Sequence, residues 1–249
     1  MSNADLSPSS THLSNKAIAP EDRLIFALDV PGADQARALV EALGDSITFY
    51  KLGLELCMAG GYFELIEWLI AKHKKVFVDL KFFDVPQTVA SAVKQISRHG
   101  ATFATVHGND AILKAAAAEK GELKILAVTA LTSLDQGDMD DLGFKTDVKD
   151  LVLSRARRAL ESGCDGVISS GLEAPALREN IDNKLIVITP GIRPVKNTDD
   201  QKRTVDVEEA FLNGADYIVV GRPIRDHHGF DTPKAAAEDI QRRIKGLFG

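Results

Sequence analysis

The segment KVFVDLKFFDVP, residues 75–86, joins a buried strand to a cluster of charges. Its apolar run ends in Asp79, Lys81 and Asp84, just before Pro86. Because side chains alternate along a strand, Asp79 and Lys81 point to the same face if the strand continues through both. Charges at the end of a buried strand are costly unless they are paired. A lysine between two carboxylates therefore indicates a functional site more strongly than a surface ion pair.

Short β-branched segments alternate with longer helical patterns from Arg23 to the C-terminus. The strands recur about every 25 residues, which predicts βα units and a parallel sheet. Repeated through the chain, these units predict an α/β protein of a single domain, a (β/α)8 TIM barrel. The competing doubly wound sheet usually has GxGxxG after its first strand, whereas this chain has Asp-Val-Pro-Gly there. The predicted strands are residues 24–29, 48–52, 76–80, 103–107, 124–129, 166–169, 185–189 and 217–220.

Helical patterns fill the stretches between these strands, and most of them end at a glycine, as helices commonly do. The two longest connections, residues 131–146 and 191–204, are long for a compact domain, and such loops are often functional lids. The predicted helices are residues 34–43, 63–72, 87–99, 111–119, 148–162, 207–213 and 233–248.

Residues 1–22 are rich in Ser, Asn and Pro and are predicted to be a disordered lead-in to a catalytic barrel domain over residues 23–249. This lead-in lacks the apolar core of a signal peptide, and no stretch reaches the ~20 apolar residues that cross a bilayer. We therefore expect a cytoplasmic protein with no membrane partner. The net charge of −6 argues against nucleic acid as a partner.

Polar residues recur where the predicted strands end, which is where a barrel builds its active site. The first strand ends in Asp29, and the second runs to Lys51. The loops after the last two strands contain PGIRP (residues 190–194) and GRPI (residues 221–224), with glycine and arginine together. Glycine lets the backbone approach an anion, and arginine can bind two phosphate oxygens at once. These loops predict a phosphate site, with two ordinary turns carrying solvated arginines as the alternative.

No set of metal ligands stands out at the strand ends, where His107 is the only histidine. Cys57 and Cys164 lie in no CxxC or Cys/His cluster, which weighs against a disulfide framework or a zinc site. A GxSxG elbow and a P-loop are also missing from the sequence. The sequence therefore predicts no metal and no cofactor.

Six segments resemble the orotidine 5′-phosphate decarboxylase family in order and spacing. The DxKxxD pattern alone is shared with sugar-phosphate lyases of the same superfamily, but its combination with LTS and with PGIRP followed by Gln201 is specific. The resemblance implies cofactor-independent decarboxylation of orotidine 5′-phosphate to UMP and CO2, the last step of de novo pyrimidine biosynthesis. The segments are ALDV (27–30), YKLG (50–53), DLKFFDVPQT (79–88), VTALTS (128–133), PGIRP (190–194) and VVGRPI (219–224).

The resemblance implies roles for the charged residues. Lys81 matches the lysine that protonates C6 as CO2 departs, and Asp79 matches the carboxylate beside the substrate's own carboxylate. Lys51 matches a lysine that bonds the ribose and completes the charged array. Asp84 and Thr88 match residues that enter the neighbouring subunit's site, so a homodimer with shared active sites is expected.

The remaining matches concern the ribose, the base and the phosphate. Asp29 matches another ribose contact, and Thr132 with Ser133 matches a pair near the pyrimidine edge. Gln201 matches a glutamine that bridges base and phosphate, so the loop that carries it is expected to close over the phosphate. The phosphate grip is expected from Arg193, Gly221 and Arg222.

The implied chemistry suits these residue types. Loss of CO2 leaves an electron pair in the plane of the ring at C6, which the π system cannot delocalise. A fixed ammonium beside C6 stabilises that charge and supplies the proton. The nearest alternative is a Mg²⁺-dependent sugar-phosphate decarboxylase or aldolase, which would lose activity in EDTA. A second alternative is a phosphate-ligand sensor that binds UMP without consuming orotidylate.

Overall fold

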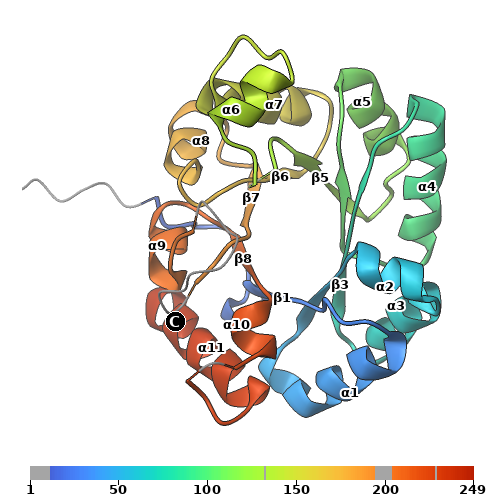
Figure 1. Cartoon of the computed structure of the whole chain (residues 1–249), viewed down its shortest axis with the longest axis vertical. Coiled ribbons are helices and arrows are strands. Elements are labelled where there is room, and N and C mark those ends of the chain that lie inside the picture. Colours follow the sequence, from blue (N-terminus) through green and yellow to red (C-terminus); the bar gives the residue numbers. More distant parts are fainter. Residues whose placement is uncertain (1–11, 132, 194–203, 228) are drawn as a thin grey trace, which may run out of the picture.

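In the computed structural model, which describes residues 12–131, 133–193, 204–227 and 229–249, parallel strands close into a barrel. The strands follow the order β1 to β8 around the ring, and β1 pairs with both β2 and β8. Helices form the outer layer (Figure 1). The predicted (β/α)8 barrel is therefore confirmed. The strands are β1 (Leu24–Ala27), β2 (Phe49–Leu52), β3 (Lys75–Phe82), β4 (Phe103–Val106), β5 (Lys124–Val128), β6 (Gly166–Ile168), β7 (Ile186–Thr189) and β8 (Tyr217–Val220).

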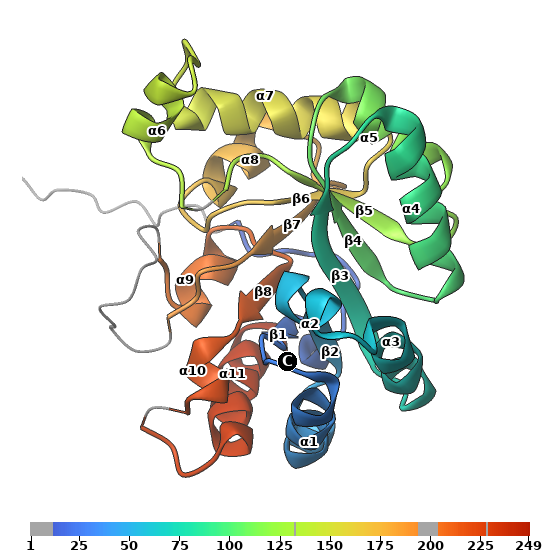
Figure 2. The same ribbon diagram turned by 45° about the vertical axis from the view of Figure 1, so that its right-hand side comes forward.

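All of the predicted helices are present, with ends that differ by about one residue from the prediction. Figure 2 shows α4 lying along β3 and β4, which it contacts. No helix of the described residues is long and apolar enough to cross a membrane. The helices are α1 (Ala33–Leu43), α2 (Leu54–Ala59), α3 (Tyr62–Ala71), α4 (Pro86–Arg98), α5 (Asp110–Ala118), α6 (Gln136–Asp141), α7 (Val148–Glu161), α8 (Ala174–Asn180), α9 (Val207–Leu212), α10 (Arg222–Arg225) and α11 (Pro233–Phe248), with 3-10 turns η1 (Pro20–Asp22) and η2 (Gly44–Ser46).

The short helices α2, α6, α8 and α10 were not predicted. Helix α6 lies inside the connection 131–146 that the sequence suggested was a long loop, so that prediction is wrong. A capping box starts α6, because the side chains of Asp135 and Asp138 each accept a hydrogen bond from the other's backbone N–H. Only Met139 of this helix is buried, which leaves no apolar periodicity for sequence reasoning to detect.

The strands place alternate side chains inside and outside the barrel. On β2, Phe49 belongs to the inner cluster, and Tyr50 belongs to the outer layer between strands and helices. The inner rings of Phe49, Phe103 and Tyr217 pack edge to face or tilted. The ring centroid of Phe103 lies 5.1 Å from that of Phe49 and 5.3 Å from that of Tyr217. Phe77 joins them from β3. Asp79 follows Phe77 on the same inward face, so the aromatic core leads directly into the charged residues.

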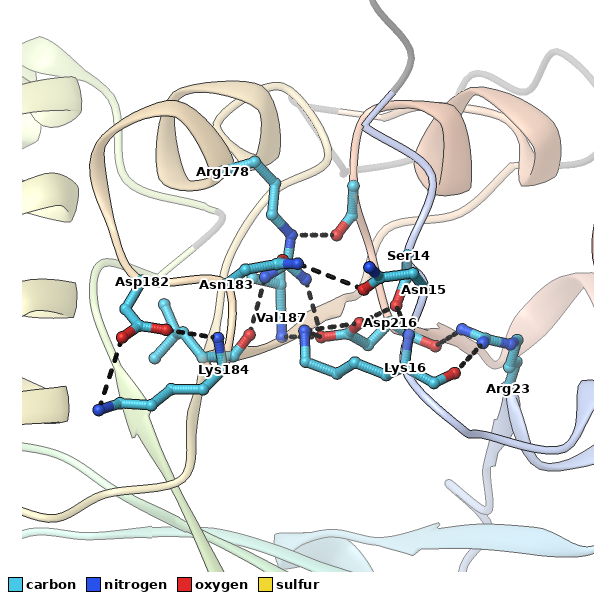
Figure 3. A network of polar contacts seen from close by, with 12 residues as sticks. Ser14, Asn15, Lys16, Arg23, Arg178, Asp182, Asn183, Lys184, Val187 and Asp216 are labelled. Atoms are coloured by element: carbon cyan, nitrogen blue, oxygen red, sulfur yellow. Dashed lines mark hydrogen bonds and ion pairs between the residues drawn. The ribbon is translucent and has the colours of Figure 1, made fainter.

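Residues 12–22 pack against the N-terminal end of the barrel, whereas the sequence suggested a disordered lead-in through residue 22. Ile18 packs against the inner cluster, and Ser14 and Lys16 bond to the buried Asp216 (Figure 3). The anchors are side chains some 200 positions away in the chain, which local sequence patterns do not reveal. Residues 1–11 lie outside the described residues.

Candidate active site

A cavity of about 240 Å³ lies at the C-terminal ends of the strands. Its walls include apolar side chains from inside the barrel, such as Phe77, Ile168 and Val219. Charged side chains make up much of the remaining lining, and most of these were predicted from the sequence. The predicted residues that line the cavity are Asp29, Lys51, Asp79, Lys81, Arg193, Gly221 and Arg222.

Four of these side chains form a chain of alternating charge across three strands. The Lys51 Nζ lies 3.5 Å from Asp29 Oδ1 and 3.3 Å from Asp79 Oδ2. The Lys81 Nζ lies 3.0 Å from Asp79 Oδ1. The order Asp29, Lys51, Asp79, Lys81 therefore follows the strand order β1, β2, β3, because neighbouring parallel strands bring their ends side by side.

Asp79 is the centre of this array, and 13% of its side chain is exposed. Burial by itself raises the pKa of the Asp79 carboxyl, but attraction from Lys51 and Lys81 and hydrogen bonds from Lys81 and Thr105 outweigh that effect. The net result is a pKa of Asp79 below its ordinary value of 3.8. Asp79 is accordingly an anion at neutral pH, held between two ammonium groups.

Lys81 reaches the cavity through a distorted strand. Val78 pairs with Ala104 and Phe82 pairs with Val106, so the register shifts between Val78 and Phe82 as in a β-bulge. Lys81 has a φ of 49°, in the left-handed region that costs a non-glycine residue about 1–3 kcal/mol when the surrounding structure enforces it. Asp79 and Lys81 share one side, as the sequence predicts, but a bulge produces this arrangement and not regular alternation.

The arginines lie on the loops after β7 and β8. Pairing with Val205 fixes the backbone at Arg193. The Arg193 N–H donates a hydrogen bond to Val205 O at 3.0 Å, next to a β-bridge between Ile192 and Val205. Gly221 precedes α10, and a Cβ at this position would lie 3.3 Å from the Cβ of Ala27. A side chain at residue 221 would therefore press against the Ala27 side chain beside the cavity.

Several predicted residues are not in this cavity. Asp84, Thr88 and Ser133 are exposed and do not line it. The Asp84 carboxylate accepts a hydrogen bond from Val85 N at 2.6 Å. Within the described part of the chain, Asp79 is the only carboxylate that pairs with Lys81. The expected arrangement, in which Lys81 lies between two carboxylates of its own chain, is therefore not observed. Thr132 and Gln201 lie outside the described residues.

Sequence reasoning missed Arg225 and Thr105. Arg225 lines the cavity, and its Nη1 donates to the backbone oxygen of Asp29 at 3.0 Å, which ties α10 to the end of β1. Thr105 lies on β4, fully buried, and hydrogen-bonds to Asp79. Both could have been found by spacing: Arg225 is one helical turn after Arg222, and Thr105 shares an inward face with Phe103.

The described residues contain no group of three or more His, Cys, Asp and Glu side chains placed to hold a metal ion. The polar chemistry of the cavity is instead that of ammonium, guanidinium and carboxylate groups, described above. Such a site can bind an anion at the arginines and stabilise a developing negative charge at Lys81.

Fold and cavity together define a (β/α)8-barrel protein with a charged site at the C-terminal strand ends. Residues 22–240 match the Orotidine 5′-phosphate decarboxylase / HUMPS family, and the chain belongs to that family. It is 65% identical to the orotidine 5′-phosphate decarboxylase of Methylococcus capsulatus over 95% of this chain and 97% of the relative. It is 48% identical to the enzyme of that name from Xanthomonas campestris pv. campestris, over 92% of this chain and 94% of the relative.

Solved structures agree with this assignment. The crystal structure of orotidine 5′-phosphate decarboxylase from Lactobacillus acidophilus superposes with a TM-score of 0.79 at 35% identity, covering 90% of this chain and 99% of that one. The structure of the Pyrococcus horikoshii enzyme superposes with a TM-score of 0.71 at 24% identity, covering 90% and 99%. At that lower identity the second comparison supports the fold alone.

Proposed function

We propose that this chain decarboxylates orotidine 5′-phosphate to UMP and CO2, the last step of de novo pyrimidine biosynthesis. The observation that carries the proposal is the Lys51–Asp79–Lys81 array, which lines the same cavity as Arg193 and Arg222. Relatives that bear this enzyme's name and match nearly the full chain support it. The array suits the substrate's carboxylate, which leaves as CO2, and the arginines suit its phosphate.

Lys81 is the proton donor in this proposal. As the bond from C6 to the carboxylate breaks, CO2 leaves and the bonding electron pair stays on C6. The ammonium of Lys81 stabilises that pair and then transfers one proton to C6, which leaves a neutral amine that solvent reprotonates. Its side chain is 37% exposed, so the ammonium has an open side for substrate even while it contacts Asp79.

Asp79 fixes the ammonium and lies beside the substrate's carboxylate. Because the pKa of Asp79 lies below its ordinary value, the group meets that carboxylate as an anion. Any repulsion between them must be offset by binding elsewhere on the substrate. Lys51 and Asp29 are assigned to the ribose, and Thr132, Ser133 and Gln201 to the base and its link to the phosphate.

The phosphate supplies the binding energy for this arrangement, through Arg193, Gly221 and Arg222. We expect Arg222→Ala to lower kcat/KM for orotidine 5′-phosphate by more than about tenfold, with a much smaller effect on the unphosphorylated nucleoside orotidine. Arg242→Ala on the exposed face of α11 is the matched control for loss of an arginine. If kcat/KM of Arg222→Ala for the phosphorylated substrate stays within about threefold of wild type, the phosphate contacts do not supply this binding energy.

One ultraviolet assay tests the activity itself. We expect the purified chain to consume orotidine 5′-phosphate at the same rate with and without EDTA. Loss of activity in EDTA would favour the metal-dependent sugar-phosphate alternative. Tight binding of UMP without any consumption of orotidine 5′-phosphate would favour the sensor.

We also propose a homodimer in which Asp84 and Thr88 complete the partner's site. Both residues are exposed and absent from their own cavity, and the neighbouring side chains of Phe83 and Val85 are 68% and 62% exposed. An apolar pair of this kind beside the site suits burial against a second copy.

Complementation tests the shared site. Asp84→Ala and Lys81→Ala should each be inactive, but a mixed dimer contains one site with both native residues. Random exchange should therefore restore about a quarter of the wild-type activity, since half the dimers are mixed and each has one working site. No recovery, despite subunit exchange shown by mass spectrometry, would assign Asp84 to its own chain's site or to none.

A further inference from the structure

Thr105 on β4 touches both partners of the central ion pair. Its hydroxyl oxygen accepts a hydrogen bond from Lys81 N at 2.9 Å and donates one to Asp79 Oδ1 at 2.9 Å. The residue is fully buried. A single side-chain oxygen thus connects the backbone of Lys81 to the carboxylate of Asp79.

The β3 bulge explains why this oxygen matters. Between the pairs Val78–Ala104 and Phe82–Val106, three residues of β3 face Thr105 alone. The regular ladder cannot satisfy Lys81 N in this stretch, and a buried unsatisfied amide is costly. The Thr105 hydroxyl takes the place of the missing backbone acceptor at the position where Lys81 has its positive φ.

The same hydroxyl orients the carboxylate of Asp79. Asp79 Oδ1 accepts hydrogen bonds from Thr105 Oγ1 and, at 3.0 Å, from Lys81 Nζ. Asp79 Oδ2 forms an ion pair with Lys51 Nζ at 3.3 Å. Lys51 and Lys81 are long side chains that also face the cavity. Thr105 is the short, buried donor of the three, so it holds the carboxylate plane with little freedom of its own.

We propose that Thr105 is a positioning residue for the decarboxylation, which holds Lys81 in its left-handed conformation and fixes the rotation of Asp79. It acts through these two residues and does not line the cavity. The inference rests on the proposed function, because the geometry it maintains is that of the proton donor.

Three variants separate this role from a structural one. Thr105→Val removes the hydroxyl at nearly constant shape, and Thr105→Ser keeps the hydroxyl without the methyl. Thr189→Val is the matched control, because Thr189 is fully buried on β7 and its hydroxyl has no partner among the described residues. Thermal melting of each variant confirms that it is folded before kinetics are compared.

We expect Thr105→Val to lower kcat about 10- to 100-fold with KM within about threefold, because the Asp79 carboxylate and the Lys81 backbone N–H each lose a hydrogen bond at residues that act in the transition state. Thr105→Ser should recover most of kcat, and Thr189→Val should leave it unchanged. A Thr105→Val enzyme that is folded and keeps kcat within about threefold overturns the inference. Equal losses of kcat in the Val and Ser variants also overturn it, since the hydroxyl would then be irrelevant.

A pH profile adds a readout that a packing defect does not move. The hydrogen bond from Thr105 is one of the effects that lower the pKa of Asp79, together with the larger attraction of Lys51 and Lys81. Without it the carboxylate protonates at higher pH, so the acid limb of kcat/KM should shift upward in Thr105→Val and return in Thr105→Ser. An unshifted limb in Thr105→Val contradicts the role.

Crystal structures of the wild type and Thr105→Val test the inference without any assay. We expect Lys81 to leave its positive φ or the Asp79 carboxylate to rotate away from Lys81 in the variant. Unchanged positions of both would refute the inference even if the wild type were inactive on orotidine 5′-phosphate. Such inactivity would refute the proposed function alone.

Discussion

Two aspartates lie among cations at opposite ends of this barrel. Asp79, near the C-terminal end of β3, contacts Lys51 and Lys81 beside the cavity. Asp216, just before β8 at the N-terminal end, contacts Lys16 at 3.0 Å and Arg178 at 2.7 Å (Figure 3). Asp216 is fully buried and the Asp79 side chain is 13% exposed, and of the two only Asp79 lines the cavity.

The difference lies in what surrounds the cations. Asp216 also accepts hydrogen bonds from Ser14 Oγ and Val187 N, and its partner Arg178 donates further to the backbone oxygens of Gly214 and Leu185. The Arg178 side chain is only 6% exposed, against 37% for Lys81. The Asp216 network is closed, so it can only stabilise the fold. The Asp79 network is open on one side, so it can act on a ligand.

The backbone beside the two aspartates also differs. Val187 N reaches Asp216 from a regular strand, whereas Lys81 N reaches Thr105 from a strained one. Strain that is maintained at one residue requires support from its neighbours and is common where a side chain must face a ligand. Substitutions at the two ends should therefore affect different quantities.

The largest expected effect is on turnover at the open end. Lys81→Ala should lower kcat by at least about 10⁴-fold, because one group supplies both charge stabilisation and the proton. UMP binding should stay measurable by calorimetry, since most product contacts lie elsewhere. Lys184→Ala, which removes an exposed lysine at the closed end, should leave kcat unchanged. Turnover close to wild type in Lys81→Ala would remove this lysine from the chemistry.

The next largest effect is on stability at the closed end. Asp216→Asn should lower the free energy of unfolding by about 3–5 kcal/mol, because it leaves the Lys16 and Arg178 side chains, 19% and 6% exposed, without their counter-ion. The kcat of the folded fraction should be unchanged at saturating substrate. Urea denaturation measures the loss, with Asp182→Asn, an exposed carboxylate nearby, as the control. A loss of kcat without a loss of stability would contradict the division between the two ends.

A smaller effect is expected for Lys16→Met, which should cost about 1 kcal/mol or less. Burial, together with repulsion from Arg178 and Arg23, lowers the pKa of Lys16 more than Asp216 raises it, so the ammonium adds less than its distance suggests. The folded chain then releases this proton at lower pH than the unfolded chain. Wild-type stability should therefore rise relative to Lys16→Met as pH increases toward 10.5, the ordinary pKa of lysine. The opposite pH trend in paired urea titrations would show that the ion pair dominates.

A last effect, of similar size, isolates the strain at Lys81. Lys81→Gly should be more stable than Lys81→Ala by about 1 kcal/mol, because glycine accepts a positive φ that alanine resists. At Lys75, at the regular start of β3, glycine should instead be less stable than alanine. Urea denaturation of the four variants gives the comparison. If alanine were more stable than glycine at both positions, the bulge would store no strain.

The strands were predictable because a parallel barrel buries them on both faces, so each strand is a short apolar run in the sequence. The prediction for 217–220 coincides with β8, while that for β3 stopped two residues early because Lys81 and Phe82 continue past the apolar run. Helix α10 escaped detection because only Ile224 of its four residues is buried. Elements with one buried residue have no periodicity, and only the folded chain reveals them.

By itself the sequence determined the barrel, the family, and which charged residues stand at strand ends, since each of these depends on local alternation and order along the chain. Tertiary structure alone decided that Asp29, Lys51, Asp79 and Lys81 form one contiguous array and that Asp84 stays outside it. It also brought Thr105 and Arg225 to the site and Ser14 and Lys16 to Asp216. The physical reason is that alternation fixes only the face on which a side chain lies. Distances between side chains of different strands are set by the closure and stagger of the whole barrel.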